Sequence, residues 1–93
     1  MAYTTPHCYK AATATTVEAS YALDAKEIKL LKNDDSTNDL IVNFDQVTTG
    51  ANAFTLKAGE SIENWKINVG TMYWKSSAST VDFRCIGTAQ DNK

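Results

Sequence analysis

The sequence predicts an all-β protein: a single antiparallel β-sandwich of about seven or eight strands, with jelly-roll or Ig-like topology. Apolar and polar residues alternate through most of the 93-residue chain, which is the period of a strand with one buried face. Clusters of turn-forming residues recur about every ten residues, the spacing typical of sandwiches. The length is also that of one sandwich, so we expect one domain over 1–93.

The alternation can be followed through four segments in the first two thirds of the chain. Each segment is too short and too strictly alternating for a helix. The residues predicted to share one face are Val17, Ala19 and Tyr21 in 16–23, Ile28 and Leu30 in 27–32, and Leu40, Val42 and Phe44 in 39–45. In 53–56, Phe54 and Leu56 are predicted core positions.

Two polar segments between these strands predict turns. Residues 33–39 read NDDSTND, and such side chains can close Asx turns on their own backbone, so we expect a hairpin loop there. Residues 56–60 contain Gly59, which can take the positive φ that returns the chain into a strand opened by Glu60.

The last third of the chain contains a break in the alternation. Trp65 and Ile62 have opposite parity, so a bulge or bend near 63–64 is needed to turn both toward the core. Gly70 follows closely and leads into 71–75, a spacing that predicts a sharp hairpin or a corner where the chain changes sheets. The last strand is predicted over 81–86, with inward Val81, Phe83 and Cys85 and outward Asp82 and Arg84.

The two ends carry weaker patterns. Residues 11–16 are compatible with an extended arm, a strand or a helical turn; we favour an extended arm over 1–15, because Pro6 disfavours a helix before it. From Thr88 onward we expect a frayed end.

Cys8 and Cys85 lie near opposite ends of the chain. A bridge between them would close a long loop and stabilise the fold by roughly 4 kcal/mol in the chain-entropy model. A cytosol keeps thiols reduced, so we favour two reduced thiols, with the bridge as the alternative. Neither cysteine stands in a CxxC motif, so we expect no reactive thiolate or zinc site.

Charge and hydropathy argue against two classes of partner. The net charge is −2 and the nine basic residues are scattered, so we expect no binding to nucleic acid, which needs clustered Lys and Arg. No apolar run approaches the roughly 20 residues that span a bilayer, so we expect no membrane partner. The first six residues lack the character of a signal peptide, from which we expect manufacture in a cytosol.

We expect no catalytic residue, no metal site and no cofactor. His7 is the single histidine, and no Ser or Cys stands in a known nucleophile motif. Asp34, Asp35 and Asp39 are oxygen-rich like a calcium loop, but the loop lacks the Gly and terminal Glu of an EF-hand. The turn before Glu60 is typical of cupin jelly rolls, whose metal is held by a histidine cluster that this chain cannot supply.

The aromatic residues indicate a candidate binding surface. Trp65, Tyr73 and Trp74 are close in sequence, and exposed aromatic rings in a sandwich can stack on sugars or fill a pocket on a partner. Core packing is the competing interpretation. Tyr73 and Trp74 face opposite ways in a strand, and we expect Trp74 inside and Tyr73 toward a rim or a partner.

The strands and turns together resemble small β-sandwich structural proteins of tailed bacteriophages. The likeness covers residues 15–87. It consists of a strand and polar turn (KLLKND, 29–34), a strand of the form L-x-V-x-F (DLIVNFD, 39–45), an F-x-L-x-x-G-E turn (FTLKAGE, 54–60), paired aromatics (YWK, 73–75) and a closing strand (81–87).

The resemblance implies a virion component assembled in the bacterial cytoplasm: a capsid decoration or cement protein, or a head–tail accessory protein. Its partners would be further copies of the chain and capsid, portal or tail proteins. The candidate interface residues are Tyr3, Pro6, His7, Tyr9 and Tyr73, with the arm ordering against a neighbour. The alternative is a carbohydrate- or receptor-binding module of a tail or head fibre, with Tyr73 and Trp65 as stacking residues. A small metal-dependent enzyme is a third alternative, which the single histidine disfavours.

Overall fold

The computed structural model describes residues 8–88, and within them the chain forms strands and no helix, so no helix there could cross a membrane. The predicted all-β class and strand number are confirmed. The eight strands are β1 (Cys8–Ala14), β2 (Ala19–Ala25), β3 (Glu27–Asn33), β4 (Leu40–Phe44), β5 (Phe54–Leu56), β6 (Ser61–Trp65), β7 (Val69–Ser76) and β8 (Val81–Thr88).

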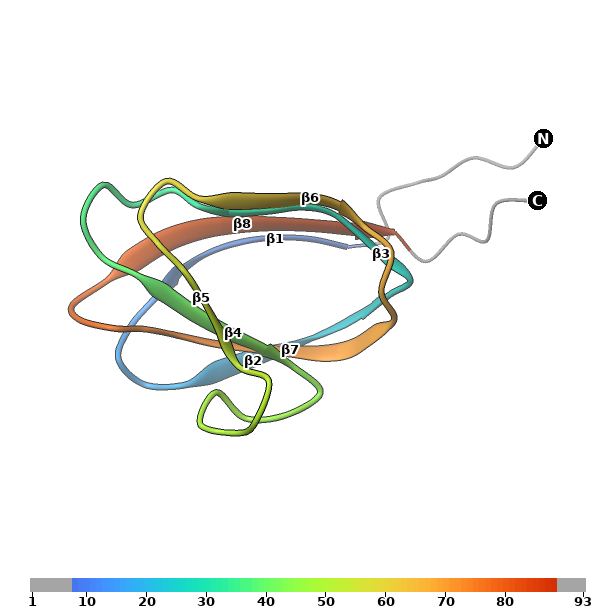
Figure 1. The fold of residues 1–93 in the computed structure, drawn as a ribbon, viewed down its shortest axis with the longest axis horizontal. Coiled ribbons are helices and arrows are strands. Elements are labelled where there is room, and N and C mark those ends of the chain that lie inside the picture. The colour runs from blue at the N-terminus through green and yellow to red at the C-terminus, as the bar shows by residue number, and fades with distance from the viewer. Residues whose placement is uncertain (1–7, 89–93) are drawn as a thin grey trace.

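The strands form two four-stranded sheets that face each other (Figure 1). Sheet 1 has the order β1-β8-β3-β6 and sheet 2 the order β2-β7-β4-β5. Every paired neighbour is antiparallel, and the first strand pairs with the last, the second with the seventh, the third with the sixth and the fourth with the fifth. This is one long hairpin rolled into a sandwich, which is the jelly-roll topology rather than the Ig-like alternative.

The core fills the space between the two sheets. Trp74 of β7 packs against Phe83 of β8 with ring centroids 5.1 Å apart, which joins sheet 2 to sheet 1. Trp74 is 4% exposed, so its predicted inward orientation is confirmed. Other fully buried side chains include Leu23, Ile28, Leu31, Leu40, Val42, Met72, Val81 and Cys85.

The first predicted strand starts later than expected. Val17 precedes β2 and is 73% exposed, and Ala19 is also exposed, so the face that they were predicted to share with Tyr21 is not buried at this end of the strand. The parity was nevertheless right, because Tyr21 is partly buried and Leu23 and Ala25 are buried on the same face.

In β3, Ile28 is fully buried, but the prediction that Leu30 shares its inward face was wrong. The register against β8 shifts by one residue between Ile28 and Leu30. Such a bulge changes which side chains face inward, and Leu31 is fully buried while Leu30 is only partly buried. In β4 and β5 the alternation holds, since Leu40, Val42 and Leu56 are buried.

One predicted turn and the predicted break in phase each contain a residue with positive φ. Gly59 has φ +81° in the turn between β5 and β6, and Asn64 has φ +54° at the predicted break in phase. The chain passes from sheet 1 to sheet 2 between β6 and β7, which agrees with the predicted alternative of a corner between sheets. That corner lies at 66–68, however, and Gly70 lies inside a continuous strand, so no hairpin follows it.

The amino-terminal segment contributes a strand to the sandwich. Cys8–Ala14 pairs with β8 along its whole length and forms one edge of sheet 1. Residues 1–7 of the expected arm lie outside the described residues. At the other end Thr88 is buried and closes β8, which corrects the expectation of fraying from that residue.

The two cysteines lie on neighbouring strands. Cys8 is opposite Gly87 in the register, two residues along β8 from Cys85. Cys85 is fully buried, as its place in the alternation predicted. The preference for reduced thiols remains a prediction.

Candidate functional site

A groove opens on one side of the sandwich, where the ends of β4, β5 and β6 meet the 66–68 corner. Its cavity volume of about 440 Å³ lies within the usual range for small-molecule sites, about 300–1,000 Å³. Its lining combines aromatic and aliphatic side chains with amides and one carboxylate: Asn43, Phe44, Asp45, Asn52, Phe54, Trp65, Ile67 and Asn68.

Three aromatic rings form the apolar wall of this groove. Phe44 lies 5.7 Å from Phe54 and 5.6 Å from Trp65 between ring centroids, and Phe54 lies 6.0 Å from Trp65. Interplanar angles of 55° to 72° give edge-to-face or tilted contacts, which favour aromatic packing. The rings pack against the core but are only partly buried, so part of their surface faces the groove.

The trio depends on the rolled topology. Phe44 and Phe54 come from β4 and β5 in sheet 2, whereas Trp65 comes from the end of β6 in sheet 1. β5 and β6 are edge strands, so no further strand of residues 8–88 covers the rings on that side.

Asp45 holds one rim of the groove against the start of β7. Its carboxylate accepts hydrogen bonds from the backbone N–H groups of Gly70 at 3.1 Å and Thr71 at 2.8 Å, and its own N–H donates to the Thr71 carbonyl at 2.7 Å. A Cβ atom at Gly70 would lie 2.7 Å from the Asp45 Oδ1 atom. Glycine is therefore needed at position 70 for this close approach.

The loop that follows β4 is held against the outer side of the sandwich. Asn43 is 2% exposed, and its amide donates to the Val47 carbonyl at 3.0 Å. Glu18 accepts hydrogen bonds at 2.6 Å from both the N–H and the hydroxyl of Thr48. These bonds hold the pKa of Glu18 below its usual value. They also restrain the loop that carries Asn52 to the rim.

Two rim amides remain available to a ligand. Asn52 and Asn68 are exposed, and neither side chain forms a hydrogen bond with another residue of the described range 8–88. Each amide offers two N–H donors and one carbonyl acceptor. The groove thus presents apolar ring surface beside unused donors and acceptors.

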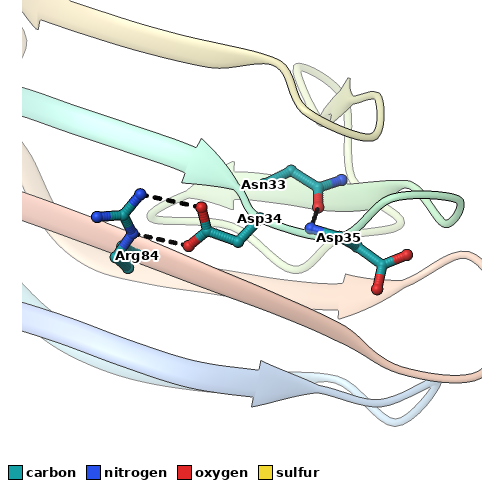
Figure 2. A network of polar contacts seen from close by, with 4 residues as sticks. All are labelled: Asn33, Asp34, Asp35 and Arg84. Atoms are coloured by element: carbon teal, nitrogen blue, oxygen red, sulfur yellow. Dashed lines mark hydrogen bonds and ion pairs between the residues drawn. The ribbon is translucent and has the colours of Figure 1, made fainter.

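The polar loop over 33–39 is built differently (Figure 2). Asp34 accepts two hydrogen bonds from Arg84, at 2.7 Å from Nε and 3.0 Å from Nη2. Asp35 accepts from the N–H groups of Asn38 at 2.7 Å and Thr37 at 3.0 Å. Arg84 lowers the pKa of Asp34, and the two backbone N–H groups lower that of Asp35.

Asn33 is the centre of the same loop. It is fully buried, its amide donates to the carbonyls of Asn38 at 2.9 Å and Leu56 at 3.0 Å, and its Oδ1 accepts from the N–H of Asp35 at 2.8 Å. The loop is therefore a folded structural element. Among residues 8–88 no three His, Cys, Asp or Glu side chains are grouped to hold a metal ion.

Of the candidate interface residues selected from the sequence, the structure describes the side chain of Tyr73 alone. Tyr3, Pro6 and His7 lie outside the described residues. Tyr9 lies in β1 opposite Ile86, and its side chain is outside the described part of the chain.

Tyr73 and Trp65, the two suggested stacking residues, lie on different surfaces. Tyr73 is partly buried and pairs in register with Ser20 and Asn43, on the face of β7 opposite the buried Met72 and Trp74. Trp65 instead lines the groove. Phe44 and Phe54, which the sequence assigned only to the core, complete the groove wall, and no local pattern could have paired them with Trp65.

Comparison with known proteins gives no relative for this chain. No protein-family model matches it, and no curated protein and no solved structure shows significant similarity.

Proposed function

We propose that this chain is a structural component of a bacteriophage virion, a capsid decoration or head–tail accessory protein that attaches by noncovalent contacts. The observation that carries the proposal is the rolled eight-stranded hairpin. Jelly rolls of this kind recur in viral capsid domains, and the support is an analogy of fold. The segments of the bacteriophage resemblance fall, in order, on β3, the 33–39 loop, β4, the 56–60 turn, β7 and β8.

The sandwich has open edges through which assembly can occur. β1 and β6 end sheet 1, and β2 and β5 end sheet 2. An edge strand has unpaired N–H and C=O groups on one side, which can pair with another chain. A small domain also gains stability from any partner that binds only its folded state. Multi-copy assembly on a particle would supply such partners.

The contacts proposed with neighbours include the amino-terminal segment. Tyr3, Pro6 and His7 precede the edge strand β1, and Tyr9 lies within it. Tyr73 lies on the outer face of sheet 2 and offers a second contact. Self-association and binding to capsid, portal or tail proteins would use these two surfaces.

The test is an add-back experiment. Purified chain is mixed with bacteriophage particles stripped of accessory proteins, and bound protein is counted after sedimentation as its concentration rises. The proposal requires saturable binding at a fixed number of copies per particle. If the chain binds neither particles nor assembly intermediates, the proposal is wrong.

A deletion of residues 2–7 sharpens this experiment. It should weaken particle binding about tenfold or more if the amino-terminal segment contributes at least 1.4 kcal/mol of contact. Tyr73→Ser is the companion variant for the second surface. Circular dichroism and thermal unfolding of each variant separate a lost contact from a lost fold.

The alternative, a carbohydrate- or receptor-binding module, is favoured by one observation. The aromatic groove carries unused amides on its rim, which the virion proposal does not require.

A further inference from the structure

We propose that the groove binds a neutral sugar ring, packed against Phe44, Phe54 and Trp65 and hydrogen-bonded by Asn52 and Asn68. This inference is independent of the virion proposal, since a sugar site could serve a virion protein or any other binding module.

The chemistry of the lining favours a sugar. A pyranose has C–H faces that pack on aromatic rings and hydroxyl groups around its rim that need hydrogen-bond partners. In the groove, the three rings supply the apolar wall, and the two rim amides supply donors and acceptors. A purely apolar ligand would make no use of the donors and acceptors that these amides offer.

The charge of the lining selects a neutral sugar. Among the described residues that line the groove, Asp45 is the one ionisable residue, and none is a Lys or Arg. Phosphate, sulfate and carboxylate groups bind through arginine, lysine or a cluster of backbone N–H groups. An anionic sugar would instead meet the Asp45 carboxylate, so we expect uncharged hexoses or N-acetylhexosamines.

The walls of the groove are held in place before a ligand arrives. Asp45 is bonded to Gly70 and Thr71, Asn43 to Val47, and the aromatic rings pack on one another. Binding a ligand to a site that is already ordered avoids much of the entropy cost of ordering side chains and loops.

A second protein chain fits this groove less well. A stable protein interface buries about 800 Å² on each partner, which requires a broad surface around an apolar centre. The apolar part of this groove is limited to three rings and Ile67, and polar side chains surround it. β5 offers only three residues for the addition of an extended peptide strand.

The test uses the full chain and free sugars. Glucose, galactose, mannose and N-acetylglucosamine are titrated at millimolar concentrations and followed by saturation-transfer NMR and by tryptophan fluorescence, and a labelled sample is applied to a glycan array. At least one neutral sugar should bind. Trp65→Leu and Asn68→Ala should each weaken that binding about tenfold or more.

Two features of the design keep the result decisive. Asn68→Ala removes no hydrogen bond with the described residues, so it reports on binding even where Trp65→Leu lowers the melting temperature. Asn38→Ala is the matched control for Asn68→Ala, because Asn38 is an asparagine outside the groove, in the loop at the other end of β4, and it should leave sugar binding within about twofold.

Three outcomes would overturn the inference. The first is that no neutral sugar binds by either method. The second is that binding is unchanged in both groove variants or is stronger for anionic than for neutral glycans. The third is that the groove variants alter only self-association, measured by light scattering, which would make a second copy of the chain the occupant. None of these results bears on the add-back experiment with particles.

Discussion

The loop over 33–39 and the aromatic groove lie at the two ends of β4, and they use polar groups in opposite ways. In the loop, the side chains of Asn33, Asp34 and Asp35 are bonded to the protein itself. In the groove, Asn52 and Asn68 have no bond to the described residues and stand beside exposed ring surface.

The difference shows that polar composition is a poor guide to a binding site. From its sequence the acidic loop is the region richer in candidate ligand-binding groups, yet the side chains of Asn33, Asp34 and Asp35 are already bonded within the fold. The groove has fewer charges, but its amides and part of its ring surface are open. The availability of a group, which depends on its neighbours, decides whether it can meet a ligand.

The largest expected effect comes from the loop. Asn33→Ala should lower the free energy of unfolding by about 2–4 kcal/mol, because it leaves the Leu56 carbonyl, the Asn38 carbonyl and the Asp35 N–H without their partner. Urea denaturation measures this. Asn38→Ala is the matched control: its amide makes a single exposed bond of 3.3 Å, to the Thr80 carbonyl, and should cost under about 1 kcal/mol. Equal losses for the two variants would contradict the structural role of the loop.

The next effect lies at the rim of the groove. Gly70→Ala places a methyl group against the Asp45 carboxylate, which must turn away and give up its bonds to the Gly70 and Thr71 N–H groups. We expect a loss of about 1–2 kcal/mol, measured by thermal unfolding. Asp45→Ala, which removes the clashing group, should make the second substitution at Gly70 nearly neutral. If Gly70→Ala still lowers stability by about 1–2 kcal/mol in the Asp45→Ala variant, the added methyl group clashes with a residue other than Asp45.

A smaller effect is expected for the ion pair at the loop. The Arg84 side chain is 43% exposed and that of Asp34 is 27% exposed, so solvent screens the pair. A double-mutant cycle with Asp34→Asn and Arg84→Gln should give a coupling of about 0.5–1 kcal/mol that falls as salt is added. A coupling as large as the effect of Asn33→Ala would reverse the order of importance proposed for this network.

The smallest effect is a dependence on pH that spans both regions. The hydrogen bonds of Glu18 to Thr48, of Asp34 to Arg84 and of Asp35 to the Asn38 N–H lower the three pKa values. A lowered pKa in the folded state stabilises the fold above the unfolded value of about 4, and this contribution is lost as the pH falls through the folded value. The urea midpoint should therefore decline below about pH 4.5.

Substitutions at Glu18 and Asp35 identify the source of that decline. Glu18→Gln and Asp35→Asn should each lower the midpoint at pH 7 and make the midpoint less sensitive to acid. Lys57→Gln is a control for altered net charge at an exposed position, and it should leave the acid slope as in the unaltered chain. An unchanged slope in both carboxylate variants would contradict the assignment.

Local patterns in the sequence were enough to predict much of the fold. Alternation located the core of β4 and β8, Gly59 marked a turn, and the change of parity between Ile62 and Trp65 marked a bend. These features depend on the steric preferences of a residue and its near neighbours. The same patterns failed where a partner strand intervened: the register shift against β8 exchanged the roles of Leu30 and Leu31.

By itself, then, the sequence determined the all-β class, the approximate strands and the burial of Trp74, because period-two alternation and turn chemistry act over a few residues. Only the tertiary structure decided the jelly-roll pairing, the central role of Asn33 and the groove. Phe44 and Trp65 are far apart in the chain and belong to different sheets, and they meet at 5.6 Å because rolling the hairpin brings the edges of β5 and β6 together. Contacts of that kind depend on how strands pair over long distances, which local pattern does not contain.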